Sequence, residues 1–332
     1  MKTLLLAALV LAPQDRKPVV ACTLPILECL AREAGGDDFE IFSLCKADQD
    51  PHYVKATPFL QRKLRGADLF VEVGLQLEIW ADLVADDSGR PRLQKGGAGR
   101  VVASKGIPRE QIPTELTRAE GHVHAEGNPH LWLDPLRAIR LAKNIGAALA
   151  AAAPAKKEAV EKRLQAFERR IRESLYGKEL LELAGAEELE RRTSDGTLFA
   201  WLEKEVLDGR KLAARLGGWL KKAEGLRGKK AVEYHRSWFY TAKVLGFEIA
   251  DAVEEKPGLP PGPRHQVELT RKLKEGGIAF LMVDAFYDPA LPNTLAKDSG
   301  VPVLVLPNQP AAGGYAEFFD GLVEQLAGAA RK

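Results

Sequence analysis

Short apolar runs alternate with helix-type segments twice along this chain, and this alternation constrains its fold more than any other feature. The apolar runs lie at residues 19–23, 39–44, 69–73 and 101–103 in the first half and at 231–234, 247–253, 278–283 and 301–306 in the second. Nearly continuous apolar runs that are separated by helices are typical of parallel strands covered on both faces of a sheet. The pattern therefore predicts an α/β protein with two lobes, each built on its own parallel sheet.

Between the two halves, apolar residues recur every three or four positions, and the residues between them are charged or small. These apolar residues are Val160, Leu164, Phe167, Ile171 and Leu175. The spacing predicts one long amphipathic helix, ended by Gly177 and roughly 30 Å long. We interpret it as a rigid link between the lobes, although an ordinary surface helix has the same pattern. The expected organisation is a signal peptide and mature N-terminus at 1–17, an N-terminal lobe at 18–153, the linking helix at 154–177, a helical insertion at 178–228 and a C-terminal lobe at 229–332.

Charge and the first residues of the chain bear on partners and location. Lys and Arg number 48 against 46 Asp and Glu, so the net charge of +2 favours neither nucleic acid nor an anionic surface as a partner.

A charged start, a short apolar run and a small residue at 1–12 are typical of a secretory signal, and the run is too short to span a bilayer. Pro13 makes cleavage after Ala12 awkward, so the cleavage site stays open. We expect export to a periplasmic or other extracytoplasmic location.

The three cysteines, Cys22, Cys29 and Cys45, form no Cys-x-x-Cys pair, so the sequence supports neither a thiolate zinc site nor a redox motif. One disulfide is possible in an oxidising compartment, and the sequence does not choose the pair. Cys22 follows a segment that superficially resembles a lipoprotein acylation box. Because five polar or proline residues separate it from the apolar run, we predict that it is a buried strand residue.

Histidines in the loops that follow predicted strands suggest a metal site. Three of the six histidines lie in the stretch 121–135, and two others stand at similar places: His52 after Asp50-Pro51, and His235 at the end of an apolar run. Imidazole is the commonest protein ligand for divalent transition metals, and the carboxyl ends of parallel strands are where α/β sheets bind ligands. His130 precedes a helix that begins at Asp134, and the positive end of that helix is expected to keep the imidazole neutral.

Four segments together resemble the substrate-binding proteins of zinc and manganese ABC uptake systems. They are Asp50-Pro51-His52, Gly127-Asn128-Pro129-His130-Leu131-Trp132-Leu133-Asp134-Pro135, Glu233-Tyr234-His235-Arg236-Ser237-Trp238 and Lys256-Pro257-Gly258-Leu259-Pro260-Pro261. The resemblance runs from about Val19 to the end of the chain, and residues 178–222 are longer than the usual linker. It implies two α/β lobes joined by one long helix, with a metal between the lobes held by His52, His130 and His235.

The resemblance also implies a fourth ligand, an aspartate after the last strand, but here that strand ends Val305-Leu306-Pro307-Asn308. Asp284, at the end of the preceding strand, is the best-placed carboxylate by topology. His124 and a bound water are its rivals. Family members often carry a histidine-rich loop before the second ligand, proposed to gather zinc, and His122 with His124 resemble a remnant of it.

Three imidazoles with at most one carboxylate favour Zn²⁺ over the harder Mn²⁺, and manganese or iron uptake is the alternative. The resemblance implies a monomer that is not an enzyme, captures the ion and docks on the membrane permease of an ABC importer. Because the histidines must be deprotonated to bind, we expect binding to weaken as the pH falls below about 6.5.

Two other classes of protein compete with this interpretation. A zinc hydrolase also uses three histidines and an open position, with Glu233 or Glu126 as the candidate general base, but no His-Glu-x-x-His motif supports it. A metal-independent adhesin predicts that a chelator leaves the thermal stability unchanged.

Overall fold

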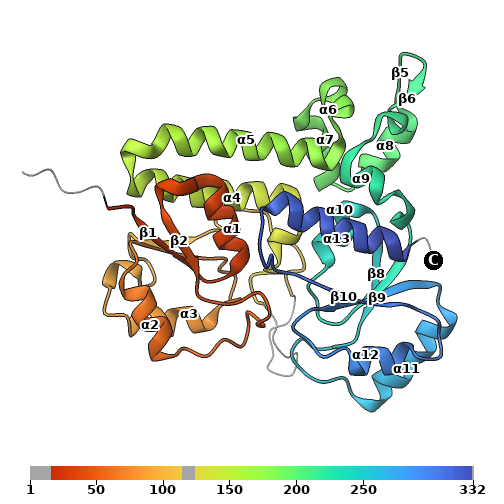
Figure 1. The fold of residues 1–332 in the computed structure, drawn as a ribbon. Helices are drawn as coiled ribbons and strands as arrows, with labels where there is room; N and C mark the ends of the chain where they lie inside the picture. The colour runs from red at the N-terminus through yellow and green to blue at the C-terminus, as the bar shows by residue number, and fades with distance from the viewer. Residues whose placement is uncertain (1–15, 114–123, 331–332) are drawn as a thin grey trace, which may run out of the picture.

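The computed structural model describes residues 16–113 and 124–330 and has two α/β lobes that lie side by side (Figure 1). This confirms the predicted fold class. The predicted signal sequence at 1–12 and His122 lie outside the described residues. No helix in the described ranges combines the length and the apolar character that crossing a membrane requires.

The N-terminal lobe contains a parallel four-stranded sheet in the order β2-β1-β3-β4. Its strands are β1 (Val19–Cys22), β2 (Glu40–Ser43), β3 (Leu69–Glu72) and β4 (Arg100–Val102). Its helices are α1 (Pro25–Gly35), α2 (Pro58–Arg65), α3 (Ile79–Asp86) and α4 (Pro135–Ala152). The Thr57 side chain caps α2 by accepting from the Leu60 amide, and Asp134 caps α4 by accepting from the amides of Leu136 and Arg137. Both helices therefore begin where a capping residue followed by proline predicts a helix start.

The C-terminal lobe repeats the architecture with a parallel sheet in the order β10-β9-β7-β8. Its strands are β7 (Lys230–Glu233), β8 (Glu248–Ala252), β9 (Ile278–Asp284) and β10 (Val303–Leu306). Its helices are α10 (Phe239–Leu245), α11 (Pro263–Glu275), α12 (Ala290–Ala296) and α13 (Tyr315–Ala329). In each lobe the carboxyl ends of the parallel strands therefore lie along one edge of the sheet, and the loops that follow the strands begin there.

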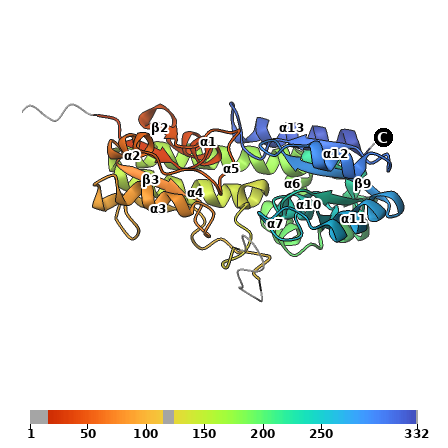
Figure 2. The same ribbon diagram turned by 90° about the horizontal axis from the view of Figure 1, so that it is seen from below.

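Helix α5 (Lys157–Tyr176) runs along both lobes and packs on α4 and α1. It buries the apolar stripe that predicted it, including Val160, Phe167 and Leu175. Figure 2, which shows the molecule from below, places the two lobes side by side along this helix.

The segment 178–228 is mostly helical, as expected, with α6 (Lys178–Ala184), α7 (Ala186–Ser194), α8 (Leu198–Lys204) and α9 (Gly218–Lys222). It also contains an antiparallel hairpin of β5 (Val206–Leu207) and β6 (Arg210–Lys211), which the prediction of a helical insertion did not include. Asp208 and Gly209 form its turn with φ of 51° and 73°. Asp-Gly is the sequence signal for such a turn, because both positions need positive φ.

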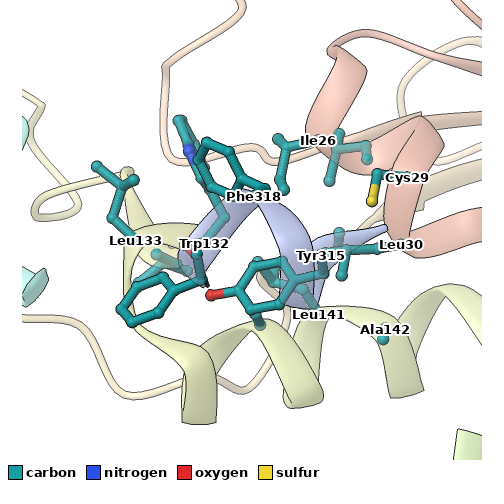
Figure 3. Close-up of a cluster of buried hydrophobic side chains, with 14 of the residues drawn as sticks. Ile26, Cys29, Leu30, Trp132, Leu133, Leu141, Ala142, Tyr315 and Phe318 are labelled. Atoms are coloured by element: carbon teal, nitrogen blue, oxygen red, sulfur yellow. Dashed lines mark hydrogen bonds between the residues drawn. The ribbon is translucent and has the colours of Figure 1, made fainter. Parts of the chain in front are cut away.

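A buried apolar cluster joins the lobes (Figure 3). It brings together Ile26 and Leu30 of α1, Trp132 of the segment before α4, and Tyr315 and Phe318 of α13. The Trp132 indole N–H donates to the Asn308 carbonyl at 2.7 Å, and the Tyr315 hydroxyl donates to the Trp132 carbonyl at 2.8 Å. Polar groups in this cluster are therefore satisfied across the lobe boundary, which favours a fixed relative position of the lobes.

The three cysteines are buried and unpaired in this structure. Cys22 lies on β1 with no exposed surface, as predicted for a strand residue of the core. Burial raises the pKa of its thiol well above the ordinary value, so the sulfur is an inert core group.

Candidate metal centre

The structure brings His52, His130 and His235 together between the two lobes. His52 lies in the loop between β2 and α2, His130 directly precedes the short 3₁₀ helix η4 (Leu131–Leu133), and His235 follows β7. One ring nitrogen from each lies within 4.8 Å of the others, and the ring centroids are 5.0 to 5.9 Å apart. The three residues are 9%, 1% and 3% exposed, so little water reaches their side chains. Three imidazoles at this spacing suit a single ion bound at about 2.0–2.1 Å from each nitrogen.

Each of the three rings is oriented by an oxygen within hydrogen-bond distance of its Nδ1 atom. The pairs are His52 with Asp50 Oδ1 at 2.7 Å, His130 with Asn128 Oδ1 at 2.9 Å and His235 with Glu254 Oε2 at 2.8 Å. Because these oxygens accept, each Nδ1 carries the proton and each Nε2 presents its lone pair, which in His52 faces His124 Nε2 at 3.2 Å. The backbone N–H of His130 also donates to Asn128 Oδ1 at 2.9 Å, which identifies that atom as the amide oxygen. This arrangement prepares three Nε2 atoms for metal binding.

His130 is held in the neutral form that a metal ligand requires. Burial lowers its pKa well below the usual value, and the neighbouring His52 and His235 lower it further. Its Nε2 atom is buried and has no hydrogen-bond partner among the described residues. Burial is the largest cause of this lowered pKa, and its direction agrees with the predicted neutrality, whereas the contribution of the helix that Asp134 caps stays a prediction.

The pKa of His235 is shifted in the opposite direction, upward. Burial lowers its pKa, but the hydrogen bond to Glu254 and the charge of Asp284 raise it more, so the net shift is upward. Glu254 Oε2 also accepts from the Gly258 amide at 2.8 Å, in the proline-rich segment that the sequence comparison singled out. That loop therefore fixes the carboxylate that orients His235.

His124 lies beside the three-histidine cluster. Its Nε2 atom is 3.2 Å from His52 Nε2, and its ring centroid is 6.4 Å from that of His130. Since the proton of His52 is on Nδ1, His124 is the donor of this hydrogen bond. The Ala125 amide donates to Gln76 Oε1 at 3.1 Å and ties the segment to the N-terminal lobe. His124 is thus close enough to His52 to remain a candidate for the fourth position.

Asp284 ends β9 as predicted and is fully buried. One carboxylate oxygen accepts from Asn308 Nδ2 at 2.8 Å and the other from the Ser237 hydroxyl at 3.3 Å. Burial raises the pKa of this carboxyl to about 6. It is not among the three side chains whose ligand atoms lie within 4.8 Å of one another, so its role as the fourth ligand stays a prediction.

Both carboxylates that the hydrolase interpretation proposes as general base are engaged by other groups in this structure. Glu233 is buried, accepts from the Trp238 amide at 2.9 Å, and has its pKa raised by burial to about 8, so it is protonated at neutral pH. Glu126 is paired with Arg109 at 2.8 Å near the surface.

The sequence interpretation missed the acceptors Asn128 and Glu254 and the donor Tyr287 as parts of the centre. Asn128 stands within a segment already singled out, two residues before His130, and that spacing is a usable signal. Glu254 and Tyr287 reach the site from other elements, and only the fold reveals them.

Comparisons with known proteins agree with this architecture. Residues 20–175 match the family described as zinc-uptake complex component A, periplasmic. The zinc-binding lipoprotein AdcA of Streptococcus pneumoniae is 26% identical over 289 residues, which are 87% of this chain and 49% of AdcA. The manganese ABC transporter substrate-binding lipoprotein PsaA of Streptococcus pneumoniae is 23% identical over 286 residues, 86% of this chain and 77% of PsaA. This chain therefore spans about half the length of AdcA.

The fold comparison extends beyond the matched residues. A crystal structure of a zinc-bound ZnuA deletion mutant superposes with a TM-score of 0.68 at 18% identity and covers 95% of this chain and 98% of that one. At this identity the likeness concerns the fold, and it includes both lobes and the helix between them. Residues 20–175, just under half of this chain, are thus similar to the zinc-uptake component A family, and the chain shares the two-lobed fold of ZnuA.

Proposed function

We propose that this protein captures one divalent metal ion, most favourably zinc, outside the cytoplasmic membrane and delivers it to the permease of an ABC importer. The observation that carries the proposal is the convergence of three oriented, buried histidines from both lobes. The names of the relatives support the class of cargo, since AdcA is described as zinc-binding and PsaA as a manganese transport protein.

In this proposal the Nε2 atoms of His52, His130 and His235 bind the ion. Asp284, His124 or a water molecule completes a four-coordinate site. A donor set of three imidazoles favours zinc, whereas manganese prefers more oxygen ligands. Burial of the site strengthens the attraction between the ion and its ligands because little water competes.

Capture and release in this proposal rest on small movements of the lobes. Helix α5 packs along both lobes, and the cluster around Trp132 and Tyr315 buries the boundary between them. Disrupting that cluster would expose large apolar side chains, so a wide opening is costly. A slight rotation that separates His235 from His52 and His130 is enough to lower the affinity when the protein meets the permease.

Equilibrium dialysis of the protein against zinc, manganese and both together tests the proposed cargo. The expected result is one zinc ion per chain, with manganese displaced when both are present, because the donors are imidazoles. Growth of cells that lack this protein, compared with cells that have it, tests delivery. We expect the cells without it to grow more slowly when zinc is scarce and to recover when zinc is added. No bound zinc, or manganese retained against zinc, would contradict the proposed specificity.

Zinc affinity is expected to fall on acidification, beginning above pH 6.5. The pKa of His235 is raised, so a proton competes with zinc at that nitrogen from a higher pH than in an ordinary histidine. His130, with its lowered pKa, adds little competition. At pH values below the raised pKa of His235, zinc must displace a proton from that nitrogen in order to bind. The apparent zinc affinity then falls about ten-fold for each unit by which the pH is lowered. Chelator competition between about pH 5 and pH 8 measures the slope, and an affinity that is independent of pH would count against a histidine site.

A further inference from the structure

A hydrogen bond between the lobes passes directly behind one of the histidines. Tyr287, in the loop between β9 and α12 of the C-terminal lobe, donates from its hydroxyl to Asp50 Oδ2 of the N-terminal lobe at 3.0 Å. The other oxygen of the same carboxylate, Oδ1, accepts from His52 Nδ1 at 2.7 Å and from the His52 amide at 2.9 Å. One carboxylate therefore connects the orientation of His52 to the position of the opposite lobe.

The Tyr287 hydroxyl is held in place by the C-terminal lobe. Its amide donates to the Asp284 carbonyl at 2.9 Å, which fixes the turn after β9. Its ring lies 4.7 Å from the ring of Tyr234 and 6.0 Å from that of His235, measured between centroids. The hydroxyl that reaches Asp50 thus moves together with His235, the histidine that this lobe brings to the metal centre.

We propose that Tyr287 is a positioning residue that couples zinc affinity to the contact between the lobes, an inference that rests on the proposed function. While the lobes touch, the hydroxyl fixes Asp50, and Asp50 holds the His52 ring with its Nε2 toward the ion. When the lobes separate, Asp50 loses this bond and His52 becomes free to turn. Hydrogen bonds to a carboxylate are stronger than those between neutral groups, and oxygens that orient metal-bound histidines tune metal affinity. Loss of the lobe contact then weakens zinc binding in two ways, because His235 moves away with its lobe and His52 loses its fixed orientation.

The test compares Tyr287→Phe with Tyr234→Phe in the full chain. Both changes remove only a hydroxyl, and the Tyr234 hydroxyl makes no hydrogen bond to the described residues. We expect Tyr287→Phe to weaken zinc binding about ten-fold in a chelator competition and Tyr234→Phe to leave it unchanged. In an Asp50→Ala background, Tyr287→Phe should cause no further loss, because the residue acts through that carboxylate. An unchanged affinity, or an equal loss in the Asp50→Ala background, would overturn the proposal.

A second readout needs no zinc. Hydrogen exchange at residues 46–55 of the metal-free protein should be faster in Tyr287→Phe than in wild type and unchanged in Tyr234→Phe, since the bond ties this loop to the other lobe. Unchanged exchange in Tyr287→Phe would also overturn the proposal. If wild type binds no zinc, the proposed function fails, whereas the exchange rates still decide whether Tyr287 connects the lobes.

Discussion

Replacing His235 with alanine is expected to weaken zinc binding by more than about 100-fold, because loss of an oxygen that merely orients a metal-bound histidine already costs 10- to 100-fold. His235 is the one histidine of the three-histidine cluster that comes from the C-terminal lobe. Without it, His52 and His130 present two imidazoles on one side of the boundary, and an ion bound to them no longer joins the lobes. Isothermal titration or chelator competition measures the loss.

His265→Ala is the matched control for this prediction. His265 lies on α11 of the same lobe, and its Nε2 is 2.8 Å from the Ala252 carbonyl, outside the three-histidine cluster. Its removal should leave the zinc affinity unchanged. Thermal melts of both metal-free variants show whether they fold. Zinc binding in folded His235→Ala that matches wild type would refute the proposed site.

Zinc is also expected to raise the melting temperature of the protein, and a chelator to reverse the rise. Free zinc at about 1,000 times its Kd adds about 4 kcal/mol to the free energy of unfolding, because the unfolded chain does not assemble the site. For a chain of this size that corresponds to a rise of roughly 5–10 °C in Tm. Differential scanning calorimetry with and without zinc measures it.

The same experiment separates metal capture from metal-independent adhesion. The folded His235→Ala protein should show little or no rise at the same zinc concentration, because its site lacks a ligand from one lobe. A wild-type Tm that neither zinc nor chelator changes would favour the adhesin interpretation instead.

Local patterns predicted most of the elements. The apolar run at 69–73 became β3, and Thr57-Pro58 and Asp134-Pro135 begin α2 and α4, because caps and strand patterns depend on neighbouring residues. The hairpin at 206–211 was missed because four strand residues in a leucine- and lysine-rich segment give little periodicity. Only its Asp208-Gly209 turn marks it.

For the metal centre too, some features could be predicted from the sequence and others only from the fold. The sequence identified His52, His130 and His235 as candidates, whereas the fold showed that burial is the largest cause of the lowered pKa of His130. Burial depends on the packing of both lobes, so a local pattern does not report it.

By itself the sequence determined the class of fold, the linking helix and which histidines are candidate ligands, since strand and helix periods and imidazole chemistry are properties of short segments. Only the tertiary structure decided that three nitrogens meet within 4.8 Å, that Glu254 and Tyr287 support them, and that Asp284 is engaged by Asn308 and Ser237. The physical reason is that these distances depend on how two lobes pack across a shared apolar cluster, and residues far apart in the chain contribute to that packing together.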